Sequence, residues 1–201
     1  MQHKMIIAVA AAATVSVGVV VASSANAHDR STKAWLATAD GTRIGAVSFT
    51  PAGRSTEVKV RLSGVPGLDA FHGFHIHAND VPSNGEGCIA DPAAASSTWF
   101  VSADGHFNPT TANHGHHVGD MPVVYVNSDG SVETRFRIDR IETGVLRGKV
   151  VILHAGADNF ANIPLGSGAT QYTANSADAI AATARTGNAG DRVACGVIGE
   201  R

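Results

Sequence analysis

The sequence predicts an all-β fold, a Greek-key antiparallel β-sandwich or flattened barrel of about eight strands with two long functional loops. Three observations support this prediction. Short segments rich in Val, Ile, Thr and Phe are separated by clusters of Gly, Asn, Asp, Ser and Pro, as strands are separated by turns. Helical periodicity is scarce. Two long connections, residues 79–121 and 156–191, show no strand pattern, which is typical of functional loops.

The expected strands follow one another along the chain with turn signals between them. In TEVKVRLS (56–63) hydrophobic and polar residues alternate, as in a strand with one buried face. ADGT (39–42) and SDGS (128–131) have the composition of hairpin turns. Only ADAIAATA (177–184) has the pattern of a short helix. The strands are expected at residues 34–39, 44–50, 56–63, 73–78, 122–127, 131–138, 149–155 and 192–198.

The first 27 residues have the three-part pattern of a secretory signal peptide. Lys4 precedes an apolar run, and a small-residue cleavage site ends at Ala27. The apolar run is borderline in length for a membrane span, and the polar segment after it favours cleavage. We therefore expect a signal peptide at 1–27 and one domain at 28–201, without a stable membrane span after cleavage. The protein is expected to be exported, and either to stay in the periplasm or another extracytoplasmic space or to be secreted.

Charge and cysteine content restrict the partners and the compartment. Without the signal the chain has 14 basic and 17 acidic residues, a near-neutral balance that argues against nucleic acid as a partner. The two cysteines, Cys88 and Cys195, both follow the signal, and an even, minimal count in an exported chain suggests one disulfide. Such a bond would close a loop of about 100 residues and stabilise the fold by roughly 4–5 kcal/mol in the chain-entropy model.

Seven of the ten histidines lie on two expected strands and in the first long connection. His75 and His77 alternate in GFHIH, so in a strand they point to the same face with Cα atoms roughly 6.5–7 Å apart. His154 ends an apolar strand, where an imidazole has no packing role. Histidine and carboxylate together are the ligands of copper(II) and zinc. The polar connection adds His106, His114, His116, His117 and Asp120.

Six motifs occur in one order between about Phe71 and Gly199: GFHIH, the GC at 87–88, GHFNP, HVGD, ILHAGADNF and TGNAGDRVACGVIG. Together they resemble the copper–zinc superoxide dismutases, and ILHAGADNFANIP is most similar to the bacterial, exported members of that family. The resemblance implies an antioxidant oxidoreductase that converts two superoxide anions to dioxygen and hydrogen peroxide by copper redox cycling. It implies copper and zinc as cofactors and a small anion as the substrate.

The resemblance also assigns roles by position. His106 matches an imidazole that bridges copper and zinc and can supply a proton during catalysis. Arg192 matches a guanidinium that receives the anionic substrate, and Asp158 a carboxylate that hydrogen-bonds one ligand of each metal. Cys88 and Cys195 match an intrasubunit disulfide. The implied metal ligands are His75, His77, His106 and His154 for copper, and His106, His114, His117 and Asp120 for zinc.

The zinc loop departs from the pattern of the family. His117 follows His114 by only three positions, where most members have a longer interval. The two histidines and Asp120 can still converge on one ion around a turn, or His116 can replace one of them. A copper-only dismutase, and a non-catalytic copper-binding or buffer module on the same fold, stay open as alternatives. No sequence pattern tells whether the protein forms a homodimer, or whether it is retained or released after export.

Overall fold

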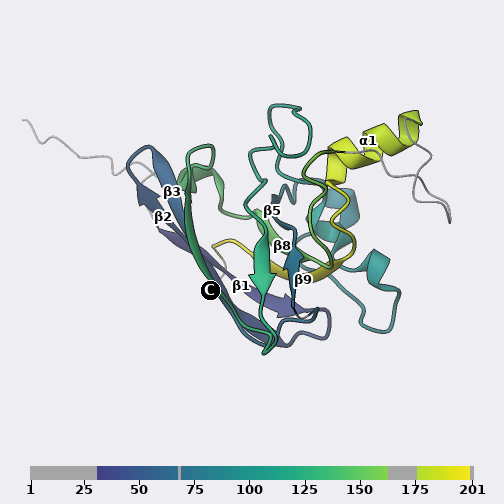
Figure 1. Ribbon diagram of the computed structural model, residues 1–201, viewed down its shortest axis with the longest axis horizontal. Helices are drawn as coiled ribbons and strands as arrows, with labels where there is room; N and C mark the ends of the chain where they lie inside the picture. Colours follow the sequence, from purple (N-terminus) through teal and green to yellow (C-terminus); the bar gives the residue numbers. More distant parts are fainter. Residues whose placement is uncertain (1–30, 68, 163–175, 200–201) are drawn as a thin grey trace, which may run out of the picture.

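The computed structural model describes residues 31–67, 69–162 and 176–199 (Figure 1). The expected signal peptide, residues 1–27, lies outside the described residues. Among the residues that are described, no helix has the length and hydropathy needed to cross a bilayer.

The described chain forms an antiparallel, curved half-barrel sheet, which confirms the all-β prediction (Figure 1). Its strand order is β5-β8-β9-β1-β2-β3-β7, and β4 pairs separately with β6. The bounds are β1 Thr32–Thr38, β2 Arg43–Ala52, β3 Ser55–Leu62, β4 Ala70–His72, β5 Phe74–His77, β6 Val124–Val126, β7 Val132–Ile138, β8 Val150–His154 and β9 Arg192–Val197. All eight predicted strands occur, with ends that differ by no more than two residues.

The prediction missed β4, because this strand has only three residues and only Gly73 separates it from β5. His72, at its end, is buried, and its ring nitrogens lie 2.7 Å from the carbonyl oxygens of His154 and Gly67. The imidazole therefore ties β4 to the end of β8 and is not directed at the other histidines.

The two strands at one edge of the sheet, β5 and β8, are buried on both faces, which explains how histidines can be enclosed in a β-sheet. β3 alternates between buried and partly exposed positions, as its sequence pattern predicts. In contrast, every residue of β5 and β8 is buried. Phe74 and Ile76 pack into the main apolar core, while His75 and His77 alternate with them and point to the opposite side. The long loops cover that side.

The two long connections carry the remaining regular structure. The first contains the 3-10 helices η2 Pro82–Asn84, η3 Ser96–Thr98 and η4 Val101–Ala103. The second contains α1, Ala177–Thr186, which runs two residues beyond the predicted helix. Ser176 accepts a hydrogen bond from the amide of Ala179 and caps the start of α1, and Gly187 ends the helix with φ 60°.

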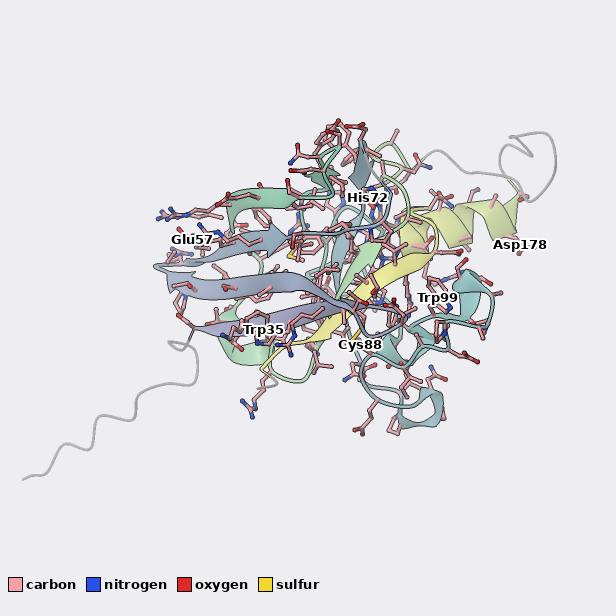
Figure 2. The ribbon with its side chains drawn as sticks, turned by 90° about the horizontal axis from the view of Figure 1, so that it is seen from below. Trp35, Glu57, His72, Cys88, Trp99 and Asp178 are labelled. Carbon is pink, nitrogen blue, oxygen red and sulfur yellow. A yellow bond between two sulfur atoms is a disulfide. The ribbon has the colours of Figure 1, made fainter. Side chains whose placement is uncertain are left out.

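Figure 2 shows Glu57 on the strands, far from Trp99 and Asp178 at the loop-bearing end.

The predicted disulfide between Cys88 and Cys195 is present and joins residues 107 positions apart. It attaches the first long loop to β9. The sulfur of Cys195 lies in a second, smaller apolar cluster that includes Phe100, Val150 and Ile152. This cluster packs the loop against the face of β8 that points away from the main core.

Candidate metal centre

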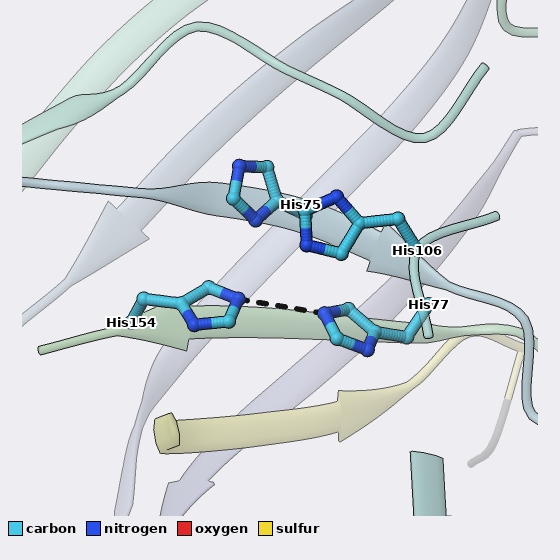
Figure 3. Close-up of side chains that lie close together, drawn as sticks. All are labelled: His75, His77, His106 and His154. Carbon is cyan, nitrogen blue, oxygen red and sulfur yellow. Dashed lines mark hydrogen bonds between the residues drawn. The ribbon is translucent and has the colours of Figure 1, made fainter. Parts of the chain in front are cut away.

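Four imidazoles from two strands and one loop face one another (Figure 3). His75 and His77 lie on β5, and His154 ends the antiparallel neighbour β8. The loop is brought alongside β5 by two isolated backbone bridges, from His77 to His106 and from His75 to Asp120. One ring nitrogen of each of His75, His77, His106 and His154 lies within 4.8 Å of the others, and all four residues are buried.

The nitrogens that point inward lack other partners. His75 Nδ1 and His106 Nε2 are buried without a hydrogen-bond partner among the described residues. His77 Nε2 and His154 Nε2 lie 3.4 Å apart and face each other. Buried polar atoms in proteins are almost always satisfied, so this arrangement fits a cation at the centre of the four nitrogens. A set of imidazole donors suits copper.

The outward nitrogens of three rings are fixed by the protein, which leaves the inward nitrogen of each ring free to bind a metal. His77 Nδ1 donates to the carbonyl oxygen of Asp104 at 2.8 Å, and His154 Nδ1 to that of Gly190 at 3.1 Å. His75 Nε2 lies 3.0 Å from Asp158 Oδ1. Such outer contacts set the tautomer and the orientation of a metal-binding imidazole.

A second group of potential ligands shares His106 with the first. His106 Nδ1 lies 2.8 Å from Asp120 Oδ1, while its Nε2 points into the four-imidazole group. His117 Nδ1 lies 3.2 Å from the same carboxylate oxygen and 3.2 Å from His106 Nδ1. His114 has a ring nitrogen within 4.8 Å of the ligand atoms of His106 and Asp120. His116 is exposed and lies outside this group. The ligand atoms that lie within 4.8 Å of one another belong to His75, His106, His114 and Asp120, and His117 joins them through its contacts with His106 and Asp120. Imidazoles together with a carboxylate form a donor set that suits zinc.

Asp158 connects the two groups, as the resemblance implies. Its Oδ1 lies 3.0 Å from His75 Nε2 and 3.7 Å from His114 Nε2. Burial favours the neutral acid, but hydrogen bonds from His114 and His75 outweigh it and hold the pKa of Asp158 well below its usual range. Asp158 is therefore an anion that orients one ring of each group.

A pocket of about 750 Å³ opens beside the four imidazoles and is lined by His77, His106, His154 and Arg192. The Arg192 guanidinium donates to the carbonyl oxygens of Phe100 and Asp104. These two contacts use two of its five N–H donors and fix its plane. The structure thus places a fixed cation at the wall of a pocket that is also lined by three of the four imidazoles.

The comparison with known protein families agrees with this geometry. The family model described as copper/zinc superoxide dismutase matches residues 43–198. The chain belongs to this family. The two clusters are compatible with the copper and the zinc that give the family its name.

Relatives in several organisms match most of the chain. Superoxide dismutase (Cu-Zn) of Mycobacterium tuberculosis is 35% identical over 170 residues, which cover 82% of this chain and 68% of that protein. The Deinococcus radiodurans enzyme of the same name is 30% identical over 167 residues, covering 76% and 86%. Extracellular superoxide dismutase (Cu-Zn) of Drosophila melanogaster is 33% identical over 174 residues, covering 80% and 78%.

Solved structures show the same fold. A double mutant of a SOD-like protein from Bacillus subtilis superimposes with a TM-score of 0.58 at 23% identity, covering 82% of this chain and 95% of that one. The clock protein EA4 superimposes with a TM-score of 0.59 at 27% identity, covering 84% and 93%.

Within this dismutase fold, the short loop around His114 and His117 is held from two sides. On one side the amide of His114 donates to the carbonyl oxygen of Ala184 in α1 at 2.6 Å. The His114 ring also packs so closely on Gly187 that a Cβ there would come within 2.2 Å of His114 Nε2. On the other side Arg140 Nη1 donates to the carbonyl oxygens of Gly115 at 3.0 Å and His117 at 3.3 Å.

Arg140→Ala is therefore expected to weaken zinc binding about fivefold while leaving copper binding unchanged, because it frees only the loop that carries His114 and His117. Zinc affinity is measured by competition with a chromophoric chelator. Arg61→Ala is the control, since Arg61 is exposed on β3 and pairs with Glu133 at 3.0 Å. Equal zinc affinities in the two variants would show that Arg140 does not hold the loop.

Sequence reasoning missed two residues that line the pocket, Arg185 and Asp104. Arg185 lies in the last turn of α1 and adds a second cation. Asp104 accepts hydrogen bonds with its carbonyl oxygen from His77 and Arg192. Neither residue stands out in the sequence, because only the path of the two loops brings them to the pocket.

Burial gives the metal-free site a marked pH dependence. It lowers the pKa of His106 to about 4, against the opposing hydrogen bond to Asp120. Burial also lowers the pKa of His77 and of His154 well below the ordinary histidine value. Burial raises the pKa of Asp120, but hydrogen bonds from His106 and His117 outweigh it and leave the pKa well below its usual range.

The metal-free protein is expected to lose stability as the pH falls from about 6.5 to about 4. In this window the unfolded chain takes up protons on histidines that the folded chain keeps neutral, so the free energy of unfolding falls with pH. The pKa change of His106 alone corresponds to roughly 3 kcal/mol at most. Urea unfolding in the presence of a chelator measures the effect. A free energy of unfolding that is constant across this pH range would contradict the burial of neutral imidazoles.

Proposed function

We propose that this protein is a copper–zinc superoxide dismutase that acts outside the cytoplasm. The observation that supports the proposal best is the position of four inward imidazole nitrogens, without other partners, beside the fixed guanidinium of Arg192. A copper buffer needs the imidazoles but has no use for an anion-binding arginine. A purely structural β-sandwich domain needs neither the imidazoles nor the arginine.

The ligands we propose are His75, His77, His106 and His154 for copper, and His106, His114, His117 and Asp120 for zinc. Bound copper would supply the one-electron chemistry that oxidises one superoxide and reduces the next. The second group would hold the Nδ1 side of His106 and keep its Nε2 directed into the pocket. The position of this pocket gives solvent access to His106 and His154.

Side chains of the protein would bind the superoxide anion and transfer a proton to the reduced substrate. Arg192 has N–H donors left for a small anion, since two of its five are engaged by carbonyl oxygens. Arg185, on the same pocket, would add to the attraction of anions. His106 Nε2 faces both the pocket and the other imidazoles, so when no metal holds it, it is the nitrogen that we expect to take up a proton from solvent and pass it to the reduced substrate.

The decisive experiment is metal analysis of the purified protein combined with a dismutase assay. We expect about one copper and one zinc per chain and a rate far above that of the same copper in buffer. Removal of copper by a chelator should abolish the rate, and copper added back should restore it. A fully loaded protein no faster than free copper would overturn the proposal. Copper without zinc would place the protein among copper-only dismutases.

We further propose that residues 1–27 are a signal peptide, that 28–201 form the mature domain, and that the protein is exported. The secretory pattern, the disulfide and the extracellular relative in Drosophila melanogaster support this. Mass spectrometry of the protein from the extracytoplasmic fraction should give a chain that begins at His28. A full-length chain confined to the cytoplasm would exclude export.

A further inference from the structure

Asp104 adopts a backbone conformation that residues with a Cβ avoid. Its φ is 63° and its ψ is −153°, and this region is essentially restricted to glycine. The next residue, Gly105, is a glycine, but the residue that adopts this conformation is Asp104. An aspartate held in this conformation must be fixed by other contacts.

The Asp104 carboxylate provides these contacts. It is buried, and Oδ2 accepts hydrogen bonds from the amides of Asp80 at 2.7 Å and Val81 at 2.8 Å. Oδ1 accepts one from Asn84 Nδ2 at 2.7 Å. The carboxylate therefore binds the whole turn that leads into η2. Val81 and Asn84 in this turn line the same pocket as Arg192.

The Asp104 carbonyl oxygen holds two side chains of the site. It accepts a hydrogen bond from His77 Nδ1 at 2.8 Å and another from the Arg192 guanidinium. The orientation of one imidazole and of the pocket arginine thus depends on where this single oxygen lies. The carboxylate's contacts fix the backbone in this conformation, so without the carboxylate the oxygen would no longer be held in place, even where a glycine relieves the strain.

We infer that Asp104 is a positioning residue: its carboxylate, anchored on the turn 80–84, fixes the carbonyl oxygen that orients both His77 and Arg192. The inference rests on the proposed function for its consequence in catalysis. The three donors also partly compensate the negative charge of the carboxylate, which otherwise would oppose the binding of an anion in this pocket.

Two substitutions separate the anchor from the backbone strain. Asp104→Gly removes the carboxylate and can adopt the same backbone conformation without strain. Asp104→Asn keeps an acceptor for the two amides, and rotation of the Asn84 amide can restore the third contact. Asp129→Gly is the matched control, because its carboxylate also accepts an amide hydrogen bond, from Ser131 at 2.8 Å, in an exposed turn of the hairpin before β7.

Three measurements test the inference. In metal-free protein, amide hydrogen exchange at Asp80 and Val81 reports the anchor without reference to activity. In copper- and zinc-loaded protein, titration with azide, a small anionic probe, reports the position of Arg192. The copper(II) electron paramagnetic resonance spectrum reports the orientation of His77.

We expect Asp104→Gly to speed exchange at Asp80 and Val81 about tenfold, to weaken azide binding about tenfold and to change the spectrum. In Asp104→Asn the exchange rates at Asp80 and Val81 should stay within about twofold of wild type. This variant should bind azide at least as tightly as wild type. Asp129→Gly should match wild type on all three. Wild-type behaviour of Asp104→Gly, or an equal loss in Asp104→Asn, would overturn the inference. A wild-type protein that binds copper but lacks dismutase activity would instead refute the proposed function, and the exchange and azide contrasts would still decide the role of Asp104.

Discussion

Replacing Arg192 with alanine is expected to lower kcat/KM for superoxide about 100-fold and to leave copper and zinc affinity within about twofold of wild type. The guanidinium is the fixed cation at the pocket wall, and it is held by carbonyl oxygens of Phe100 and Asp104 and not by any imidazole. Its loss therefore removes the donor to the anion and leaves the nitrogens that would bind metal in place. Stopped-flow decay of superoxide, with metal content measured on the same samples, tests both parts.

Arg192→Lys is the informative companion variant. Lysine keeps the positive charge but cannot make the two carbonyl contacts with a planar fork, so its rate should lie between those of wild type and alanine. The exposed Arg61 on β3 supplies the control, because Arg61→Ala removes an arginine that does not line the pocket. If Arg192→Ala kept a rate within about threefold of wild type, a passive copper-binding module would explain the site better.

Much of the fold and of the candidate site was predictable because it rests on local patterns. The alternation in β3 and the hairpin turns define strands through contacts between near neighbours. The placement of His75 and His77 on one face follows from the two-residue period of a strand. The disulfide followed from the parity of the cysteines and from their match to the family.

The rest depends on contacts between residues far apart in sequence. Arg140 reaches the loop of His117 from the segment after β7, and Arg185 reaches the pocket only because α1 ends there. In the sequence Asp104 is an ordinary loop residue. Its positive φ and the three hydrogen-bond donors around its carboxylate are visible only in the structure. In each case the partner is set by the path of a long loop, on which hydrophobic periodicity carries no information.

Loss of the disulfide is expected to reduce the stability of the protein by about 4–5 kcal/mol, since the bond closes a loop of more than 100 residues in the unfolded chain. Replacing Cys88 and Cys195 together by alanine avoids a free thiol. Urea unfolding of the metal-free protein, compared with wild type before and after reduction, measures the change. Reduced wild type and the double variant should agree. If the free energies of unfolding of wild type and the double variant differed by less than about 1 kcal/mol, the unfolded chain would already be restricted in this region without the disulfide.

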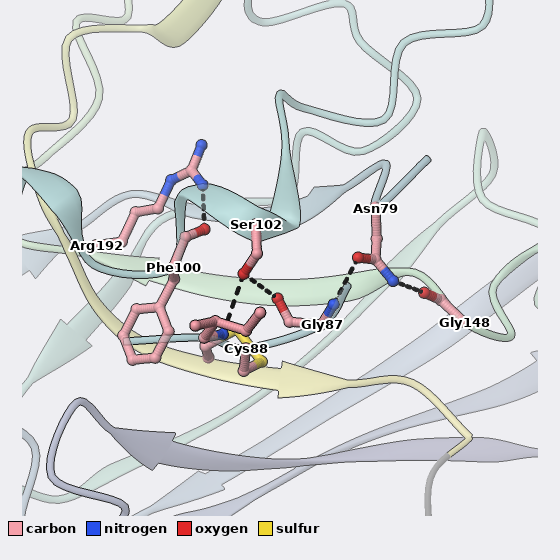
Figure 4. Close-up of a disulfide and its surroundings, with 9 residues drawn as sticks. Asn79, Gly87, Cys88, Phe100, Ser102, Gly148 and Arg192 are labelled. Carbon is pink, nitrogen blue, oxygen red and sulfur yellow. Dashed lines mark hydrogen bonds between the residues drawn. A yellow bond between two sulfur atoms is a disulfide. The ribbon is translucent and has the colours of Figure 1, made fainter. Parts of the chain in front are cut away.

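The disulfide should also influence the rate, because it supports the residues that hold Arg192 (Figure 4). Ser102, in η4, donates to the carbonyl oxygen of Gly87 at 2.7 Å and accepts from the amide of Ile89 at 3.0 Å, on either side of Cys88. The carbonyl oxygen of Phe100, just before η4, accepts from Arg192. A loosened loop would therefore shift one of the two oxygens that fix the guanidinium.

Ser102→Ala separates these two effects. It removes both hydrogen bonds to the loop but leaves the disulfide intact. We expect it to lower kcat/KM about threefold to tenfold at a cost of about 1–2 kcal/mol in stability, well below that of disulfide loss. The double alanine variant, assayed at a temperature at which it is fully folded, should show a loss of rate of similar size. If both variants kept the wild-type rate, the disulfide would act on stability alone, and Arg192 would be held sufficiently by the carbonyl oxygen of Asp104.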